Sequence, residues 1–221
     1  DELATSKRFK NIKLLNYVDE YDPDVQKQFA AMTYRLSLDT YLVVFRGTDD
    51  TLIGWKEDFH MTYMDHVPAQ RRAASYLQNV MKEFPKGRFL VAGHSKGGNL
   101  ATYACTYLPD SLFERVDAIY SYDAPGLNKA IIETEGYQRT SPYIRRFVPQ
   151  GSIVGMMLEV PEPTTIVKSH AFGGFAQHDA FTWEIKDDSF VTVSETSPDS
   201  QQTDLTLKQW VRETSADERK K

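Results

Sequence analysis

The chain has 221 residues, of which 41% are hydrophobic and 26% are charged, as in a globular protein with one sizeable core. Its net charge of −5 argues against a nucleic-acid partner, because such proteins usually present a basic face. No apolar run approaches a membrane span, and the single cysteine, Cys105, excludes an internal disulfide. We therefore expect one domain over residues 1–221 in the cytoplasm, although a trimmed N-terminus stays open because no Met begins the chain.

The predicted elements begin with a hairpin of two strands, at residues 28–36 and 40–46. Residues 55–65 have the pattern of a short helix or a mobile loop. An amphipathic helix follows over residues 69–84, because a proline precedes it and a Pro-Lys-Gly run ends it.

Strands then alternate with helical patterns along the rest of the chain. The further strands are predicted at residues 88–92, 116–122, 144–148, 164–168 and 181–185. A C-terminal helix is predicted from Leu205, Leu207, Trp210 and Val211. This alternation predicts an α/β fold with a mostly parallel sheet and helices on both faces. Ligands of such sheets gather at the carboxyl ends of the strands.

A G-x-S-x-G pentapeptide, Gly93-His-Ser-Lys-Gly97, lies directly between a strand pattern and a helix pattern. In this context the serine stands exposed on a sharp strand-to-helix turn, and small residues on either side relieve the crowding. Ser95 is therefore the candidate nucleophile. The alternative is a glycine-rich turn with an incidental serine.

A serine hydroxyl needs a base to remove its proton. Elbow hydrolases have the chain order nucleophile, acid, histidine, which leaves His170 and His178, since the other three histidines precede Ser95. His94 adjoins the serine and is predicted to be a hydrogen-bonded packing residue. We favour His178 as the base, because it lies in a polar loop just before the strand predicted at 181–185.

A catalytic serine and histidine usually work with an acid that orients the histidine, and the sequence offers several candidates for it. Asp123 ends the strand after the elbow helix, in an Asp-Ala-Pro-Gly turn at the expected sheet edge. Its carboxylate either orients the histidine or hydrogen-bonds its own turn. Asp179 is adjacent to His178, where side chains diverge, and Glu159 lies beyond the loop after residue 149. We favour Asp123 and keep the other two as alternatives.

Negative charge that develops on the substrate oxygen requires hydrogen-bond donors that already point toward it. One donor is expected to be the N–H of Lys96, which follows the nucleophile. The second is expected from the Phe45-Arg-Gly-Thr run at a strand end, where Thr48 offers an amide and a hydroxyl. The alternative is a plain turn with Arg46 in a salt bridge.

Taken together, these motifs resemble those of the class 3 lipases, an α/β-hydrolase family. The matching runs are Val-Val-Phe-Arg-Gly-Thr-Asp at 43–49, Gly-Trp-Lys-Glu-Asp at 54–58 and Gly-His-Ser-Lys-Gly-Gly-Asn-Leu-Ala at 93–101. The Lys-Gly-Gly-Asn form, with Ser-Tyr-Asp-Ala-Pro-Gly-Leu at 121–127 and the Gln-His-Asp run at 177–179, is closer to a bacterial lipase-like branch of unknown function. The resemblance covers about residues 28 to 183.

The resemblance implies Ser95 as nucleophile, His178 as base, and Thr48 and Lys96 as oxyanion donors. It also implies a lid at residues 52–66, although the aromatic residues there would equally suit a core. One departure concerns the acid. Class 3 lipases have it after a later strand, in a loop that ends Asp-x-Val-Pro, whereas residues 149–155 here read Pro-Gln-Gly-Ser-Ile-Val-Gly. Either Asp123 supplies the acid or the triad is incomplete.

We therefore predict a serine hydrolase that cleaves carboxylic esters through an acyl-enzyme on Ser95, with His178 as base and Asp123 as orienting acid. The expected partner is a small-molecule ester or lipid substrate, with no nucleic acid, no integral membrane segment, no metal and no cofactor. The main alternative is a non-catalytic relative that binds a lipid or acyl ligand. A peptidase or acyltransferase on the same triad is a third possibility, and the sequence leaves the oligomeric state open.

Overall fold

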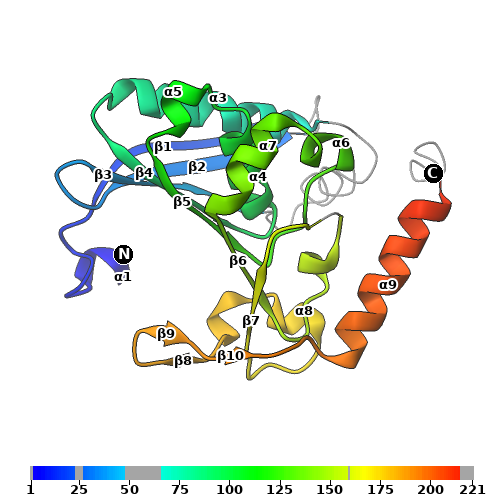
Figure 1. The fold of residues 1–221 in the computed structure, drawn as a ribbon. Coiled ribbons are helices and arrows are strands. Elements are labelled where there is room, and N and C mark those ends of the chain that lie inside the picture. Colours follow the sequence, from blue (N-terminus) through cyan, green and yellow to red (C-terminus); the bar gives the residue numbers. More distant parts are fainter. Residues whose placement is uncertain (1, 23–26, 48–65, 159, 215–221) are drawn as a thin grey trace.

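A mixed eight-stranded sheet forms the centre of the fold (Figure 1). The computed structural model describes residues 2–22, 27–47, 66–158 and 160–214. The sheet has the strand order β1-β2-β3-β4-β5-β6-β7-β10. Its strands are β1 (Lys13–Asp22), β2 (Lys27–Arg35), β3 (Thr40–Phe45), β4 (Arg88–His94), β5 (Val116–Tyr122), β6 (Ile144–Pro149), β7 (Thr164–Val167) and β10 (Thr192–Val193). Strands β3 to β7 are parallel, and β1, β2 and β10 join the sheet antiparallel.

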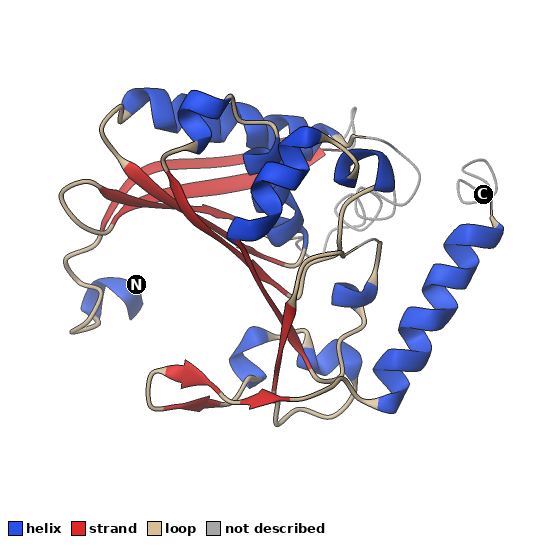
Figure 2. Cartoon of the chain, in the orientation of Figure 1, coloured by secondary structure: helices blue, strands red, loops and turns tan. Residues whose placement is uncertain are grey.

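Helices and short 3-10 turns surround the strands of the sheet (Figure 2). They are α1 (Glu2–Thr5), α3 (Pro68–Glu83), α4 (Lys96–Thr106), α5 (Asp110–Phe113), α6 (Lys129–Ile132), α7 (Glu135–Thr140), α8 (Gly174–Gln177) and α9 (Pro198–Glu213), with 3-10 turns η1 (Ser141–Tyr143), η2 (Val154–Met156) and η3 (Ala180–Thr182). Helices α3, α4 and α7 pack together on one face of the sheet (Figure 1). Within the described ranges, no helix combines the length and the apolar character that crossing a bilayer requires.

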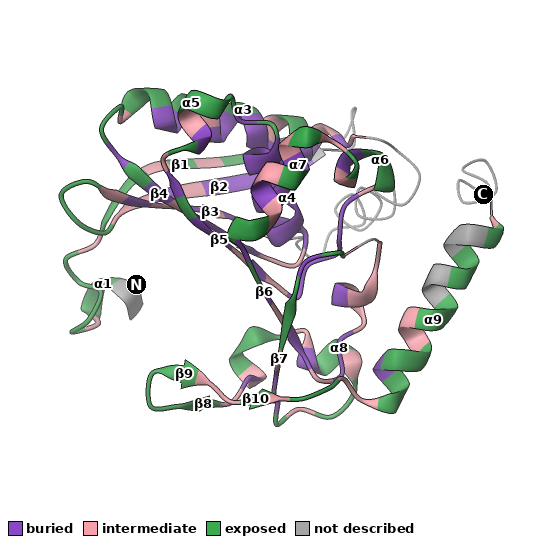
Figure 3. Cartoon of the chain, viewed as in Figure 1, coloured by how far each residue is buried: buried purple, intermediate pink, exposed green. Residues whose placement is uncertain are grey.

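A continuous core lies between the sheet and helices α3 and α4 (Figure 3). Every residue of α4 is buried, so this helix is enclosed on all sides, and its polar side chains Lys96 and Asn99 are hydrogen-bonded to backbone carbonyls. The opposite face of β5 and β6 is covered by the segment that follows β7. There the rings of Tyr122 and Phe147 stack 5.5 Å apart, and Phe190, from the β8 (Ile185–Lys186) and β9 (Ser189–Phe190) hairpin, packs 5.6 Å from Phe147.

Most of the predicted elements are confirmed. The strand at 116–122 has the predicted bounds, and those at 28–36, 40–46, 88–92, 144–148 and 164–168 differ from the structure by one or two residues at an end. The hairpin is antiparallel, and the amphipathic helix at 69–84 is α3. The fold is the predicted α/β arrangement around a mostly parallel sheet.

One sequence expectation fails and one strand was missed, and each has a physical cause. The strand expected at 181–185 is wrong, because Asp179 accepts the N–H of Phe181 and begins the 3-10 turn η3 instead. Strand β1 was not predicted. It is an edge strand whose side chains are all exposed or half-buried, and five of its ten residues are charged or amide-bearing, so it lacks the apolar alternation of a half-buried strand.

Candidate active site

The turn from β4 into α4 holds Ser95 in a strained backbone conformation. Ser95 has φ 57° and ψ −133°, and its N–H donates to the carbonyl of Tyr122 on the neighbouring strand at 2.9 Å. A Cβ on Gly93 would lie 2.1 Å from the carbonyl carbon of Gly97, and one on Gly97 would lie 2.1 Å from the carbonyl oxygen of Phe45. Only glycine fits at these two positions, so the residues around Ser95 are dictated by the turn.

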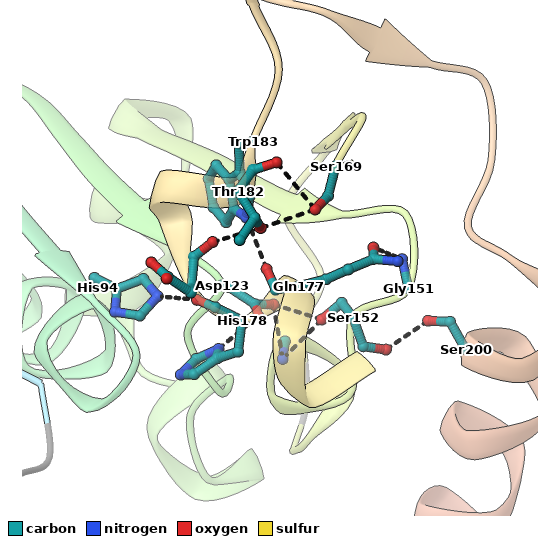
Figure 4. Close-up of polar contacts among 12 residues, drawn as sticks. His94, Asp123, Gly151, Ser152, Ser169, Gln177, His178, Thr182, Trp183 and Ser200 are labelled. Atoms are coloured by element: carbon teal, nitrogen blue, oxygen red, sulfur yellow. Dashed lines mark hydrogen bonds and ion pairs between the residues drawn. The ribbon is translucent and has the colours of Figure 1, made fainter. Parts of the chain in front are cut away.

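His178 and Asp123 lie in direct contact although they are 55 residues apart (Figure 4). The Nδ1 of the His178 ring lies 2.7 Å from Oδ2 of Asp123, as a donated hydrogen bond requires. Asp123 follows β5 and is fully buried, and His178 follows helix α8 with its side chain 21% exposed. Asp123 has φ 41°, a left-handed conformation that aspartate and asparagine tolerate better than most residues.

The second carboxylate oxygen of Asp123 is held by the loop after β6. Ser152 Oγ donates to Oδ1 of Asp123, and the Gly155 N–H donates to the same oxygen at 3.2 Å (Figure 4). A Cβ on Gly155 would lie 2.6 Å from that oxygen. The carboxylate is therefore bonded on both oxygens, which is how a buried charge is tolerated.

A buried arginine supports this loop from below. Arg146 on β6 donates to the carbonyl of Gly155, the residue whose N–H reaches Asp123. Burial lowers the pKa of Arg146, and the negative charges of Glu162 and Asp123 oppose that shift. The guanidinium thus places positive charge near the buried carboxylates of Asp123 and Glu162.

His94 fixes the position of His178 relative to the elbow. Its Nε2 lies 2.7 Å from the carbonyl oxygen of His178, so this nitrogen carries the proton, and the two rings are 4.5 Å apart. Burial lowers the pKa of His94, and the neighbouring His178 adds to the effect. The prediction that His94 is a hydrogen-bonded packing residue is confirmed. Because His94 precedes Ser95, the contact brings His178 beside the elbow.

The loop that carries His178 is fastened by the side chain of Gln177. Its Oε1 accepts the Gly151 N–H at 2.8 Å, and its Nε2 donates to the carbonyl of Ala171 at 3.1 Å. Its own carbonyl accepts from Nε1 of Trp183 at 2.8 Å (Figure 4). The bond to Gly151 ties this loop to the β6 loop that also holds Asp123, and the other two close the loop on itself.

The two predicted oxyanion donors differ in how much the structure describes. Lys96 begins α4, so its N–H stands at a helix N-terminus, where the helix supplies no acceptor. Its buried ammonium donates to the carbonyl of Gln28 at 3.1 Å. Thr48 lies outside the described residues, as does the predicted lid at 52–66 except for His66. Arg46 forms an ion pair with Asp19.

The alternative candidates occupy other environments. Asp179 is exposed, and its carboxylate accepts the Phe181 N–H within its own turn. His170 is exposed, and its N–H donates to the carbonyl of Thr182. Glu159 lies outside the described residues. The structure therefore joins His178 to Asp123 rather than to Asp179.

The described part of the chain shows no hydrogen bond between the Ser95 hydroxyl and the His178 ring. Such bonds are often long in ligand-free enzymes and tighten when substrate binds. The same residues contain no group of three histidine, cysteine or acidic side chains arranged to hold a metal ion.

Sequence reasoning missed three residues that support the site, namely Ser152, Gly155 and Gln177. Ser152 stands in the loop where the class 3 lipase pattern has its acid, and that vacancy was the available signal. Gly155 and Gln177 carried no signal, because their contacts depend on how the β6 loop meets the His178 loop.

Comparison with known proteins gives a family and a set of structural neighbours. A family model described as Mbeg1-like matches residues 3–221. No curated protein matches the chain.

The solved structures that resemble it include three lipases. A lipase from Rhizopus microsporus var. chinensis is 18% identical with a TM-score of 0.52, over 95% of this chain and 73% of that one. The M37 lipase is 16% identical with a TM-score of 0.54, over 70% of this chain and 60% of that one. The triacylglyceride lipase of Rhizomucor miehei is 18% identical with a TM-score of 0.53, over 73% and 68%. At such identities the likeness shows the α/β-hydrolase fold.

Proposed function

The chain belongs to the Mbeg1-like family, and from its lipase-like fold and its site geometry we propose that it is a serine hydrolase that cleaves carboxylic esters. One observation carries the proposal. The His178 ring is hydrogen-bonded to the buried carboxylate of Asp123 beside a serine on a strained strand-to-helix turn. A nucleophile, a base and an orienting acid in neighbouring loops are the parts that acyl transfer requires.

In the proposed reaction, Ser95 Oγ attacks the ester carbonyl while Nε2 of His178 takes the hydroxyl proton. His178 then gives that proton to the departing alcohol, which leaves an acyl group on Ser95. Water, deprotonated by His178, releases the carboxylic acid and restores the serine. The bond from Nδ1 to Asp123 supports this role, because it holds the proton on Nδ1 and frees Nε2 for proton transfer.

The oxyanion of each tetrahedral intermediate is assigned to the N–H of Lys96 and to Thr48. The position of Lys96 at the start of α4 supports its assignment, because helix N-termini favour negative charge. Gly47 supports the second assignment. A Cβ there would lie 2.8 Å from the His94 carbonyl, so the chain that leads to Thr48 runs against the elbow.

Fluorophosphonate labelling tests the proposal directly, because the probe reacts with an activated serine. We expect labelling of the wild-type chain, none of Ser95→Ala, and labelling slowed by orders of magnitude in His178→Ala. Ser75→Ala removes an exposed serine on α3 and should label like the wild type. An intact fold that does not label would overturn the proposal. A panel of esters, amides and acyl acceptors then distinguishes esterase from peptidase or acyltransferase.

A non-catalytic protein that binds an acyl ligand is the second candidate. It is favoured by the lack of a hydrogen bond between Ser95 and His178 among the described residues. The labelling experiment separates the two, since a binding protein with an inactive serine would bind fatty acid without reacting with the probe.

A further inference from the structure

The loop that carries His178 presents three exposed phenylalanines. Residues 170–182 form a loop that is closed by a hydrogen bond from the His170 N–H to the Thr182 carbonyl at 3.0 Å. Next to this closure, Ser169 and Trp183 form an isolated bridge. Within the loop, Phe172, Phe175 and Phe181 are 100%, 72% and 96% exposed. Single exposed apolar residues are ordinary, but three phenylalanines this exposed within ten positions of one loop call for a partner.

The three rings cannot turn inward, because the loop interior is already filled. Gln177 and Trp183 are buried there, where the Trp183 ring donates to the Gln177 carbonyl and the Gln177 side chain accepts the Gly151 N–H. A Cβ on Gly174 would lie 2.6 Å from both the Gly151 carbonyl oxygen and the side chain of Ile153. The loop therefore packs tightly on the chain beneath it, and the phenylalanines remain on the outside.

The charge of the loop restricts the kind of partner. Residues 171–177 read Ala-Phe-Gly-Gly-Phe-Ala-Gln and carry no charge. The carboxylate in the loop is Asp179, which already accepts the Phe181 N–H. Ile185, which follows the loop, is 66% exposed and extends the apolar surface. A partner that binds through charge would find few contacts on this loop, whereas an apolar phase would find several.

Among apolar partners, the position of His178 favours a lipid surface over a protein. A protein seated on these rings would also cover the His178 side chain in the same loop and block its access to substrate. Three phenylalanines offer on the order of 500 Å², below the roughly 800 Å² per partner of a stable protein interface. A fluid lipid surface needs no matching shape and can itself supply the substrate.

We propose that Phe172, Phe175 and Phe181 insert into a lipid–water interface, so that the loop that bears His178 docks the protein on its substrate phase. The proposal rests on the proposed function, because the choice of a lipid partner assumes that His178 must stay accessible to substrate. Phenylalanines on the apolar side of an interfacial segment bind at the boundary between headgroups and acyl chains.

Co-sedimentation with phosphatidylcholine vesicles tests the proposal independently of catalysis when Ser95→Ala is the parent chain. We expect each Phe→Ser change to weaken the partition coefficient about fivefold, and the triple change about a hundredfold. Addition of phosphatidylglycerol should not strengthen binding, because residues 170–182 contain no lysine or arginine. Leu38→Ser, at an 82% exposed residue in the β2–β3 turn, is the matched control and should bind like the parent.

Two outcomes would overturn the docking proposal. One is vesicle binding by the triple variant equal to that of the parent. The other is a parent dimer that the triple variant converts to monomer while neither binds vesicles. Fluorophosphonate labelling of the triple variant with Ser95 restored should match the wild type. Failure of the proposed function would abolish labelling and leave vesicle binding unchanged, so the two proposals fail separately.

Discussion

Ser152 Oγ donates a hydrogen bond to Oδ1 of Asp123, the carboxylate whose other oxygen accepts from the His178 ring. The two residues come from the ends of adjacent parallel strands, β5 and β6. A class 3 lipase would have its acid in the β6 loop, where this chain has a hydroxyl. Here the carboxylate follows β5 instead, and the β6 loop supplies the donors that hold it. We propose that the acid has moved by one strand while the base kept its place.

Asp123→Asn tests the assignment of the acid with little change in shape. Asparagine tolerates the left-handed backbone of this position, so the fold should persist. An amide no longer fixes the proton on Nδ1 of the histidine, so we expect kcat for ester hydrolysis to fall about 10⁴-fold with the thermal midpoint nearly unchanged. Steady-state kinetics and thermal melts measure both effects.

The matched control for this change is Asp179→Asn, which alters the acidic residue next to His178. Its carboxylate is exposed and bonded within its own turn, so kcat should stay within a fewfold of the wild type. If Asp179→Asn were the damaging change and Asp123→Asn nearly normal, the roles would have to be exchanged.

Ser152→Ala should damage both stability and turnover. The change removes one of the two donors to Asp123 Oδ1 and leaves the Gly155 N–H alone with that oxygen. We expect a loss of about 1–3 kcal/mol of unfolding free energy and a kcat lower by about 10- to 100-fold. Denaturant titration and kinetics provide the measurements.

Ser200→Ala separates the support of the loop from the support of the carboxylate. Ser200 on α9 donates to the carbonyl of Ser152 at 2.6 Å and makes no contact with Asp123 among the hydrogen bonds of the described residues. The Ser200→Ala change should lower the free energy of unfolding while kcat remains near normal. Equal loss of kcat in both serine variants would show that Ser152 acts only by packing.

The fold was largely readable from the sequence because its interior strands follow simple patterns. Strands β4 and β5 are apolar runs of the length that a buried parallel strand needs. The hydrophobic pattern is weaker in strands at the edge of the sheet. Strand β1 pairs on one side only, so charged residues persist along it, and hydrophobic periodicity failed there.

The site divides in the same way between local and long-range information. Ser95 could be proposed as the nucleophile because the elbow is a local geometry with its own sequence signature. The contact of His178 with Asp123 joins loops 55 residues apart, and only the strand order brings them together. The sequence favoured Asp123 over Asp179 only from its place at the end of a strand, and it could not show the contact with His178 itself. The support from Gln177 carried no local signal for the same reason, and Ser152 was signalled only by the missing acid of its loop.

His94→Gln tests how burial of an imidazole contributes to pH-dependent stability. Burial lowers the pKa of His94 below its ordinary value of 6.5. The unfolded chain therefore binds a proton at this residue below about pH 6.5 while the folded chain resists, and stability falls as the pH drops from there toward the folded-state pKa.

Glutamine can still donate to the His178 carbonyl but does not titrate. We expect the wild-type unfolding free energy to fall more than that of His94→Gln between pH 7.5 and 5.5. A slope identical in the two proteins would exclude His94 as a source of the pH dependence.

Gln177→Ala tests whether the base is positioned by the fastening of its loop. The change leaves the Gly151 N–H and the Ala171 carbonyl without the bonds they make to this side chain. We expect a loss of about 1–3 kcal/mol, or a thermal midpoint lower by roughly 3–10 °C for a chain of this size. Because the loop would then hold His178 less firmly, kcat should fall while KM changes little.

Gln177→Glu keeps the acceptor for Gly151 and loses the donor to Ala171, so it should recover part of both losses. Ala176→Ser, at the exposed neighbouring position, is the control. A Gln177→Ala enzyme that is less stable but turns over normally would show that the loop is held for folding alone.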